Sequence, residues 1–155
     1  MSSVGPNSKT DWRRLRELAE EKRDACARRL GEAMAAMREA QRKLQMLVDY
    51  QQDYGQRMTH AGQGGIAAER LNNFRRFIAH LERAVDQQRA IADAAQAEVE
   101  RVQLALSVAQ RSLESFQVLA TRQQSAESVV DRREQQKLQD EYASRLLPRF
   151  LSGAD

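Results

Sequence analysis

The chain has 155 residues, of which 41% are hydrophobic, 5% aromatic and 30% charged, and its formal net charge is +3. This length suits one domain, but so few aromatic and so many charged residues argue against a large globular core and favour long helices. The two prolines, Pro6 and Pro148, lie near the ends, although average usage would place roughly seven in the interval between them. Because an interior proline breaks a helix, this interval can be continuous helix.

Cysteine content and the N-terminal sequence bear on the cellular compartment. The single cysteine, Cys26, cannot form an internal disulfide, which suits a reducing compartment. The first residues, MSSVGPNSKTD, are polar and do not resemble a signal peptide. No stretch approaches the ~18 apolar residues of a membrane helix. We therefore expect a soluble, cytoplasmic protein.

We expect residues 1–10 to be disordered and a first helix to span residues 11–54. Ser8, Thr10 or Asp11 can cap this helix by accepting a hydrogen bond from a free N–H group of its first turn. Its apolar side chains recur in steps of four and three, which is typical of a coiled-coil seam. The seam consists of Cys26, Leu30, Ala33, Met37, Ala40, Leu44, Leu47 and Tyr54, with Gln51 as a polar member.

Residues 55–65, GQRMTHAGQGG, contain four of the seven glycines. Glycine permits tightly turned backbone and disfavours helix, so this segment predicts the connection between two helices. Its length suits a helical hairpin better than a linker between domains. Helices joined by so short a connection must lie antiparallel.

A second helix is expected over residues 66–147, followed by a tail at 148–155. Its seam again alternates steps of three and four and fades after Ala120. The members are Leu71, Phe74, Ile78, Leu81, Val85, Gln88, Ala92, Ala95, Val99, Val102, Leu106, Ala109, Leu113, Phe116 and Ala120. The predicted fold is therefore all-α: a long antiparallel two-stranded coiled-coil hairpin whose second helix is longer than the first.

The difference in helix length predicts an uncovered stretch. If Tyr54 lies opposite Ile66, then Asp11 lies opposite residue 109 or so. Side chains beyond that point would lack an intramolecular partner, and an apolar stripe left without cover is commonly a binding site. The residues concerned are Leu113, Phe116, Leu119 and Val130.

Two further rows of side chains lie beside the seams, close to the glycine-rich segment. The first helix contributes Lys43, Leu47, Tyr50 and Tyr54, and the second contributes Phe77, Leu81, Ala84 and Gln88. An antiparallel hairpin brings both rows to one end. Tyr50 and Phe77 are not needed by the seams. They either broaden the core where the helices splay, or form an exposed groove for a partner segment, for which tyrosine is well suited.

Other kinds of site find little support. The basic segment 55–76 carries Arg57, Arg70, Arg75 and Arg76 against Glu69, which is a weak footprint for nucleic acid. The two histidines have no second ligand at helical spacing, and GQGG lacks the lysine of a phosphate-binding loop. A bare hairpin offers no cleft that excludes water. We expect no enzyme activity, cofactor, metal or nucleic-acid partner.

Four stretches in order resemble the flagellar export protein FliJ family: LAEEKRDACARRLGEA, KLQMLVDYQQDYGQR, GIAAERLNNFRRFIAHLERAVDQQ and DRREQQKLQDEYASR. The most specific parts are the row Leu47, Tyr50, Tyr54 and the run Asn73 to Ala84. The likeness covers nearly the whole chain.

The resemblance implies a non-enzymatic, stalk-like coiled coil of the bacterial flagellar type III export apparatus. Members of the family bind the hexameric export ATPase, contact the membrane export-gate protein and escort export chaperones. It implies a cytoplasmic protein held at the inner face of the cell membrane through its partners only. A stalk protein of an injectisome and a dimerising coiled-coil scaffold are the alternatives.

The resemblance also assigns residues. It places the surface that binds the export gate on Lys43, Leu47, Tyr50, Tyr54, Phe77, Leu81, Ala84 and Gln88, which are the two rows described above, and so favours exposure of Tyr50 and Phe77. For the ATPase we expect the uncovered stretch with Leu113, Phe116 and Leu119 to provide the contact.

Overall fold

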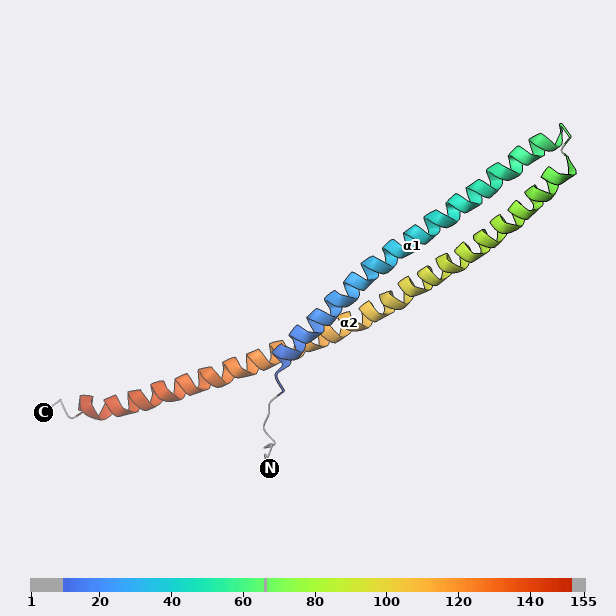
Figure 1. Ribbon diagram of the computed structural model, residues 1–155. Helices are drawn as coiled ribbons and strands as arrows, with labels where there is room; N and C mark the ends of the chain where they lie inside the picture. Colours follow the sequence, from blue (N-terminus) through green and yellow to red (C-terminus); the bar gives the residue numbers. More distant parts are fainter. Residues whose placement is uncertain (1–9, 66, 152–155) are drawn as a thin grey trace, which may run out of the picture. The chain divides into compact units, whose positions relative to one another are not determined.

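A computed structural model describes residues 10–65 and 67–151, with side chains up to residue 147. It contains two helices, α1 (Trp12–Gly62) of 51 residues and α2 (Ala68–Leu151) of 84 residues (Figure 1). The described residues contain no strand. The all-α prediction and the greater length of the second helix are thus confirmed.

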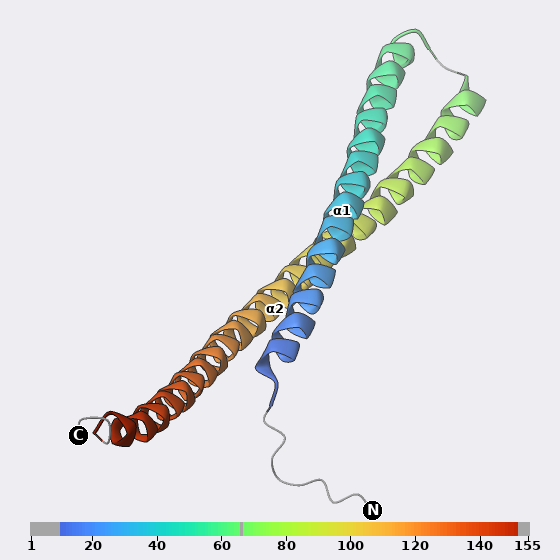
Figure 2. The ribbon, with the colours of Figure 1, turned by 90° about the vertical axis from the view of Figure 1, so that its left-hand side faces the viewer.

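The chain divides into two compact units, which are described separately. The hairpin unit is Arg23–Ala109, and the terminal unit comprises Met1–Lys22 and Gln110–Asp155. In the hairpin unit α1 and α2 lie side by side and antiparallel (Figures 1 and 2). Their direction is fixed by two contacts: Tyr54 stacks on Phe74, and the Gln88 side chain reaches Ala40, so earlier residues of α1 meet later residues of α2.

A narrow apolar seam forms the core of the hairpin unit. The buried side chains all belong to the predicted seams, and they are Cys26 and Ala40 on α1 and Leu81, Val85, Ala92, Val99, Val102 and Ala109 on α2. Burial of a leucine or valine side chain contributes about 1.5–3 kcal/mol. Because each helix buries only one stripe, stability is distributed along the seam.

The connection between the helices is shorter than predicted. Helix α1 continues through Gly55 to Gly62, beyond the expected end at Tyr54, and α2 begins at Ala68. A glycine inside a helix costs only about 1 kcal/mol, and Tyr54 keeps this part of α1 in contact with Phe74 and Phe77 of α2. Gly65 has a φ of +76°, which favours glycine and places the chain reversal immediately after α1.

In the terminal unit, the start of α1 packs against α2. Ala19, Leu113 and Ala120 are buried, and the Trp12 ring lies 6.1 Å from that of Phe116 between centroids. The Asp11 carboxylate accepts a hydrogen bond from the Arg13 N–H at 3.2 Å, which confirms Asp11 as a cap.

The prediction of an uncovered stretch on the second helix is therefore wrong in part. Leu113 is only 5% exposed, and Phe116 and Leu119 are half-buried. The prediction places Tyr54 at the end of the first helix and opposite Ile66, whereas Tyr54 contacts Phe74. The longer α1 brings its first turn to Phe116 and Gln123 of α2 rather than to residue 109.

The last part of α2 bears no seam. Every described side chain from residue 124 to 147 is exposed apart from the half-buried Leu146, and Val130 is exposed as predicted. The helix passes the expected end at Leu147 and ends at Leu151, so Pro148 lies within its last turn. Disorder is predicted for residues 1–10 and a tail for 148–155; of these, residues 1–9 and 152–155 lie outside the described residues, and 148–151 belong to α2. None of the described helices is long and apolar enough to cross a membrane.

Candidate partner-binding surface

Four aromatic side chains from both helices form one cluster near the connection. Tyr50 and Tyr54 lie one turn apart on α1, and Phe74 and Phe77 lie one turn apart on α2. Tyr54 occupies the centre, with ring centroids 4.5 Å from Phe77 and 5.3 Å from Phe74. Tyr50 lies 6.2 Å from Tyr54 and meets Phe77 edge-on at 6.1 Å. Such pairs contribute about 0.5–1.5 kcal/mol beyond their buried area.

The exposure of this aromatic cluster is intermediate between the broadened core and the exposed groove that the sequence allows. Tyr50 is 50% exposed, whereas Tyr54, Phe74 and Phe77 are half-buried. Phe77 thus contributes to the contact between the helices and also supports Tyr50 from the side. The cluster presents one tyrosine to solvent on a base of three partly covered rings.

The other predicted surface residues divide into accessible and internal ones. Lys43 is exposed, and Leu47 and Ala84 are half-buried. Leu81 is only 6% exposed and belongs to the core. Gln88 is half-buried, and its Nε2 donates to the Ala40 carbonyl oxygen at 3.0 Å. Leu81 and Gln88 therefore hold the two helices together.

A groove adjoins the aromatic cluster where α1 and α2 diverge towards the connection (Figure 2). Its volume is about 660 Å³. The lining residues are Tyr54, Met58, Ala61, Gly65, Ala67, Arg70, Asn73, Phe74 and Phe77. Met58 and Ala61 are not among the residues predicted for this surface, because residues 55–65 are predicted to be a loop. Their spacing from Tyr54, four and seven residues, is a helical signal that extends the seam.

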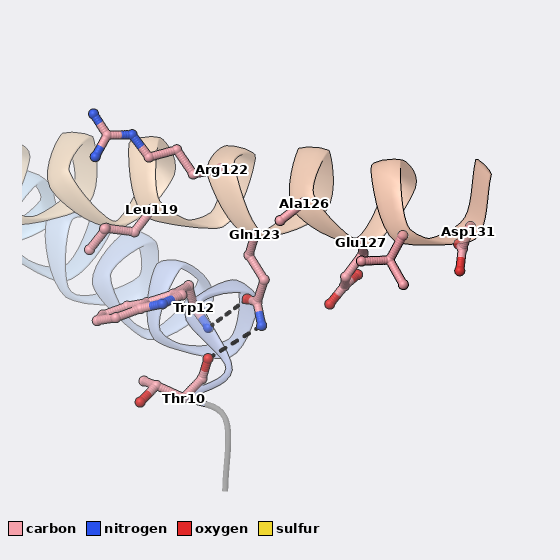
Figure 3. Close-up of a pocket in the computed structure, with 9 residues that line it drawn as sticks. Thr10, Trp12, Leu119, Arg122, Gln123, Ala126, Glu127 and Asp131 are labelled. Atoms are coloured by element: carbon pink, nitrogen blue, oxygen red, sulfur yellow. Dashed lines mark hydrogen bonds between the residues drawn. The ribbon is translucent and has the colours of Figure 1, made fainter. Parts of the chain in front are cut away.

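A second groove, of about 520 Å³, lies in the terminal unit beside Trp12. Leu119, Gln123, Ala126 and Val130 of α2 line it together with Thr10 and Trp12 (Figure 3). The Gln123 side chain accepts a hydrogen bond from the backbone N–H of Trp12 at 3.2 Å and donates to the Thr10 carbonyl oxygen at 3.4 Å. Trp12, the single tryptophan of the chain, is not among the residues predicted for a partner surface.

The described residues offer little reactive chemistry. They contain no group of three or more metal-ligating side chains, and Cys26 is buried in the seam. A hydrogen bond from Arg101 lowers the pKa of Glu98, but this is an exposed pair of neighbouring turns.

Comparisons with known proteins agree with the order of motifs along the chain. Residues 9–149 match the family model described as "Flagellar FliJ protein". A protein of that name from Salmonella typhi is 34% identical over 131 residues, covering 84% of this chain and 89% of the relative. The protein of the same name from Escherichia coli strain K12 is 32% identical over 131 residues, with the same coverage. The chain therefore belongs to the flagellar FliJ protein family.

Proposed function

We propose that the protein is a stalk-like component of the flagellar type III protein export apparatus, without enzymatic activity of its own. In this role it binds the hexameric export ATPase, contacts the membrane export-gate protein and escorts export chaperones. It is cytoplasmic and associates with the inner face of the cell membrane through these partners. Family membership supports a flagellar role over an injectisome or a general scaffold.

The observation that carries the proposal is the aromatic cluster in the hairpin unit. Tyrosine provides rigid apolar area and a hydroxyl group, and such anchors dominate many interfaces. Tyr50 is half-exposed and supported by Phe77, so it is oriented before a partner arrives. We assign the export-gate contact to Tyr50 with Lys43, Leu47, Tyr54, Phe77 and Ala84 around it. Leu81 and Gln88 contribute to this surface indirectly, by holding the two helices together.

We assign the ATPase contact to the terminal unit. Leu119, together with the groove beside Trp12, is the accessible part of the stretch inferred from sequence. The Phe116 ring lies 6.1 Å from that of Trp12 between centroids. Leu113 is too deeply buried to take part directly.

The test is a Tyr50→Ala variant assayed against both partners. Loss of an aromatic anchor costs about 2 kcal/mol or more of binding free energy, so affinity for the cytoplasmic part of the gate protein should fall at least about thirtyfold. ATPase affinity and melting temperature should stay close to those of the parent protein. Tyr50→Phe keeps the ring and removes only the hydroxyl group, so it measures the contribution of the hydroxyl to binding.

A matched control is Leu104→Ala, also in the hairpin unit and 69% exposed. It removes a similarly exposed apolar side chain outside the aromatic cluster and should leave both affinities unchanged. Unaltered gate affinity in Tyr50→Ala would refute the assignment. Equal losses for gate and ATPase, with a lowered melting temperature, would show that Tyr50 serves the fold instead.

A further inference from the structure

We propose that the gate segment bound by the hairpin unit is acidic as well as apolar, and that Arg70, in the groove beside the aromatic cluster, pairs with one of its carboxylates. This inference rests on the proposed function and specifies the chemistry of its partner. It extends the surface to Met58, Arg70 and Phe74, which lie outside the rows identified from sequence.

The floor of the groove is suited to apolar side chains. Tyr54 of α1 and Phe74 of α2 both line the groove, and their rings stack with an angle of 22° between the ring planes. Met58, one turn beyond Tyr54, lines the same space, and its flexible thioether adapts to different occupants. Ala61 and Ala67 leave room because their side chains are small. A bulky apolar side chain of a partner can therefore enter between α1 and α2.

The chain segment that supplies most of the groove's lining carries a positive charge. Residues 55–76 contain four arginines and one acidic residue, Glu69, which gives a formal charge of 4 − 1 = +3. Arg70 lines the groove and is exposed. Among the described residues, no ion pair involves Arg57, Arg70, Arg75 or Arg76. A carboxylate is the natural partner, because the planar guanidinium binds it with two parallel hydrogen bonds.

The placement of the arginines favours a peptide over a lipid surface. Arg75 and Arg76 follow Arg70 by five and six residues, which turns them about 140° and 240° around α2. Three arginines pointing in such different directions cannot all contact one flat layer of headgroups. Only Arg70 shares a side of the helix with Phe74 and Phe77, where it can act together with the apolar floor.

The decisive experiment compares Arg70→Glu, Arg70→Lys and Arg83→Glu by calorimetry with the cytoplasmic part of the gate protein. Arg83 is exposed on α2 and does not line the groove, so its reversal changes the net charge equally. We expect Arg70→Glu to weaken binding about tenfold or more and to reduce its salt dependence. Arg70→Lys should weaken it less, and Arg83→Glu should bind as the parent does. Reversing single acidic residues of the gate protein to lysine should restore binding to Arg70→Glu at one position.

Each other outcome has a defined meaning. If Arg70→Glu binds normally while Tyr50→Ala does not, the acidic partner is refuted and the proposed function stands. If neither variant loses affinity, both are refuted. A second assay uses vesicles containing phosphatidylglycerol. Vesicle binding that falls equally in Arg70→Glu, Arg75→Glu and Arg76→Glu, with unchanged gate affinity, would overturn the inference in favour of lipid. Melting temperatures establish that each variant is folded.

Discussion

The terminal unit and the hairpin unit both place aromatic rings between α1 and α2, but they secure them differently. Beside the Trp12–Phe116 pair, Gln123 bonds two backbone groups of the opposite segment, and Arg13 pairs with Glu127. Around Tyr50, Tyr54, Phe74 and Phe77, the described residues show no hydrogen bond between the helices. The nearest along α2 is made by Gln88.

The difference separates two uses of an aromatic pair. Directional bonds at Gln123 fix how the start of α1 meets α2, because a shift of one residue would leave the Trp12 N–H without its acceptor. The aromatic cluster of the hairpin unit is held by ring contacts alone, which tolerate small displacements. A surface held in this way can adapt to a partner while the seam maintains the helix pair.

The comparison of the two units requires that the buried seam maintains the fold of the hairpin unit. Leu81→Ala should lower the free energy of unfolding by about 2–5 kcal/mol, because the side chain is 6% exposed and its removal leaves a cavity. Urea denaturation measures the change. Leu104→Ala, at an exposed position, should change it by less than about 0.5 kcal/mol. An unchanged midpoint for Leu81→Ala would remove this residue from the core.

Much of the fold follows from periodicity, because burial in a two-helix hairpin depends on one stripe per helix. All eight buried side chains of the hairpin unit lie on seams that can be read from the sequence. The turn could not be placed from glycine content alone. Gly55 and Gly62 are helical since contacts with α2 outweigh their poor propensity, and among the described glycines only Gly65 has a positive φ.

Helical spacing predicts which side chains meet near the connection, but it does not predict how exposed each of them is. Spacing brings Tyr50 and Phe77 to one end of the hairpin unit, and they are in contact. Leu81 and Gln88 belong both to the predicted seam and to the predicted row beside it, and the packing across the helices gives them the internal role. Trp12 was missed because its partners, Phe116 and Gln123, are more than a hundred residues away in the chain.

The polar contact at Gln123 can be tested directly. Gln123→Ala removes the acceptor of the Trp12 backbone N–H and the donor to the Thr10 carbonyl oxygen, and losing such a hydrogen bond costs about 1 kcal/mol. Gln123→Glu should cost less, since a carboxylate still accepts from Trp12 and is favourable at a helix N-terminus. Fluorescence of Trp12, the sole tryptophan, reports local opening. Identical spectra and stability for Gln123→Ala and the parent would contradict the comparison.

The connection of the hairpin unit provides a pair of opposite effects. Gly65→Ala should destabilise by about 1 kcal/mol, because alanine is strained at a φ of +76°. Gly62→Ala should stabilise by up to about 1 kcal/mol, since the position is helical and an added Cβ meets nothing within 4 Å. Thermal denaturation of both variants gives the signs. Destabilisation by both would mean that the chain reversal begins before Gly62.

The smallest effect is expected at the ion pair of the terminal unit. Arg13 and Glu127 approach to 2.6 Å, but their side chains are 51% and 48% exposed. Exposed pairs contribute about 0.2–1 kcal/mol, and salt screens them. A double-mutant cycle with Arg13→Ala and Glu127→Ala should give a coupling in this range that falls at high salt. The pair Glu39 and Arg42, within α1, is a control of similar exposure that does not join the helices. A coupling larger than the loss in Gln123→Ala would show that charge, rather than the glutamine, determines how α1 begins against α2.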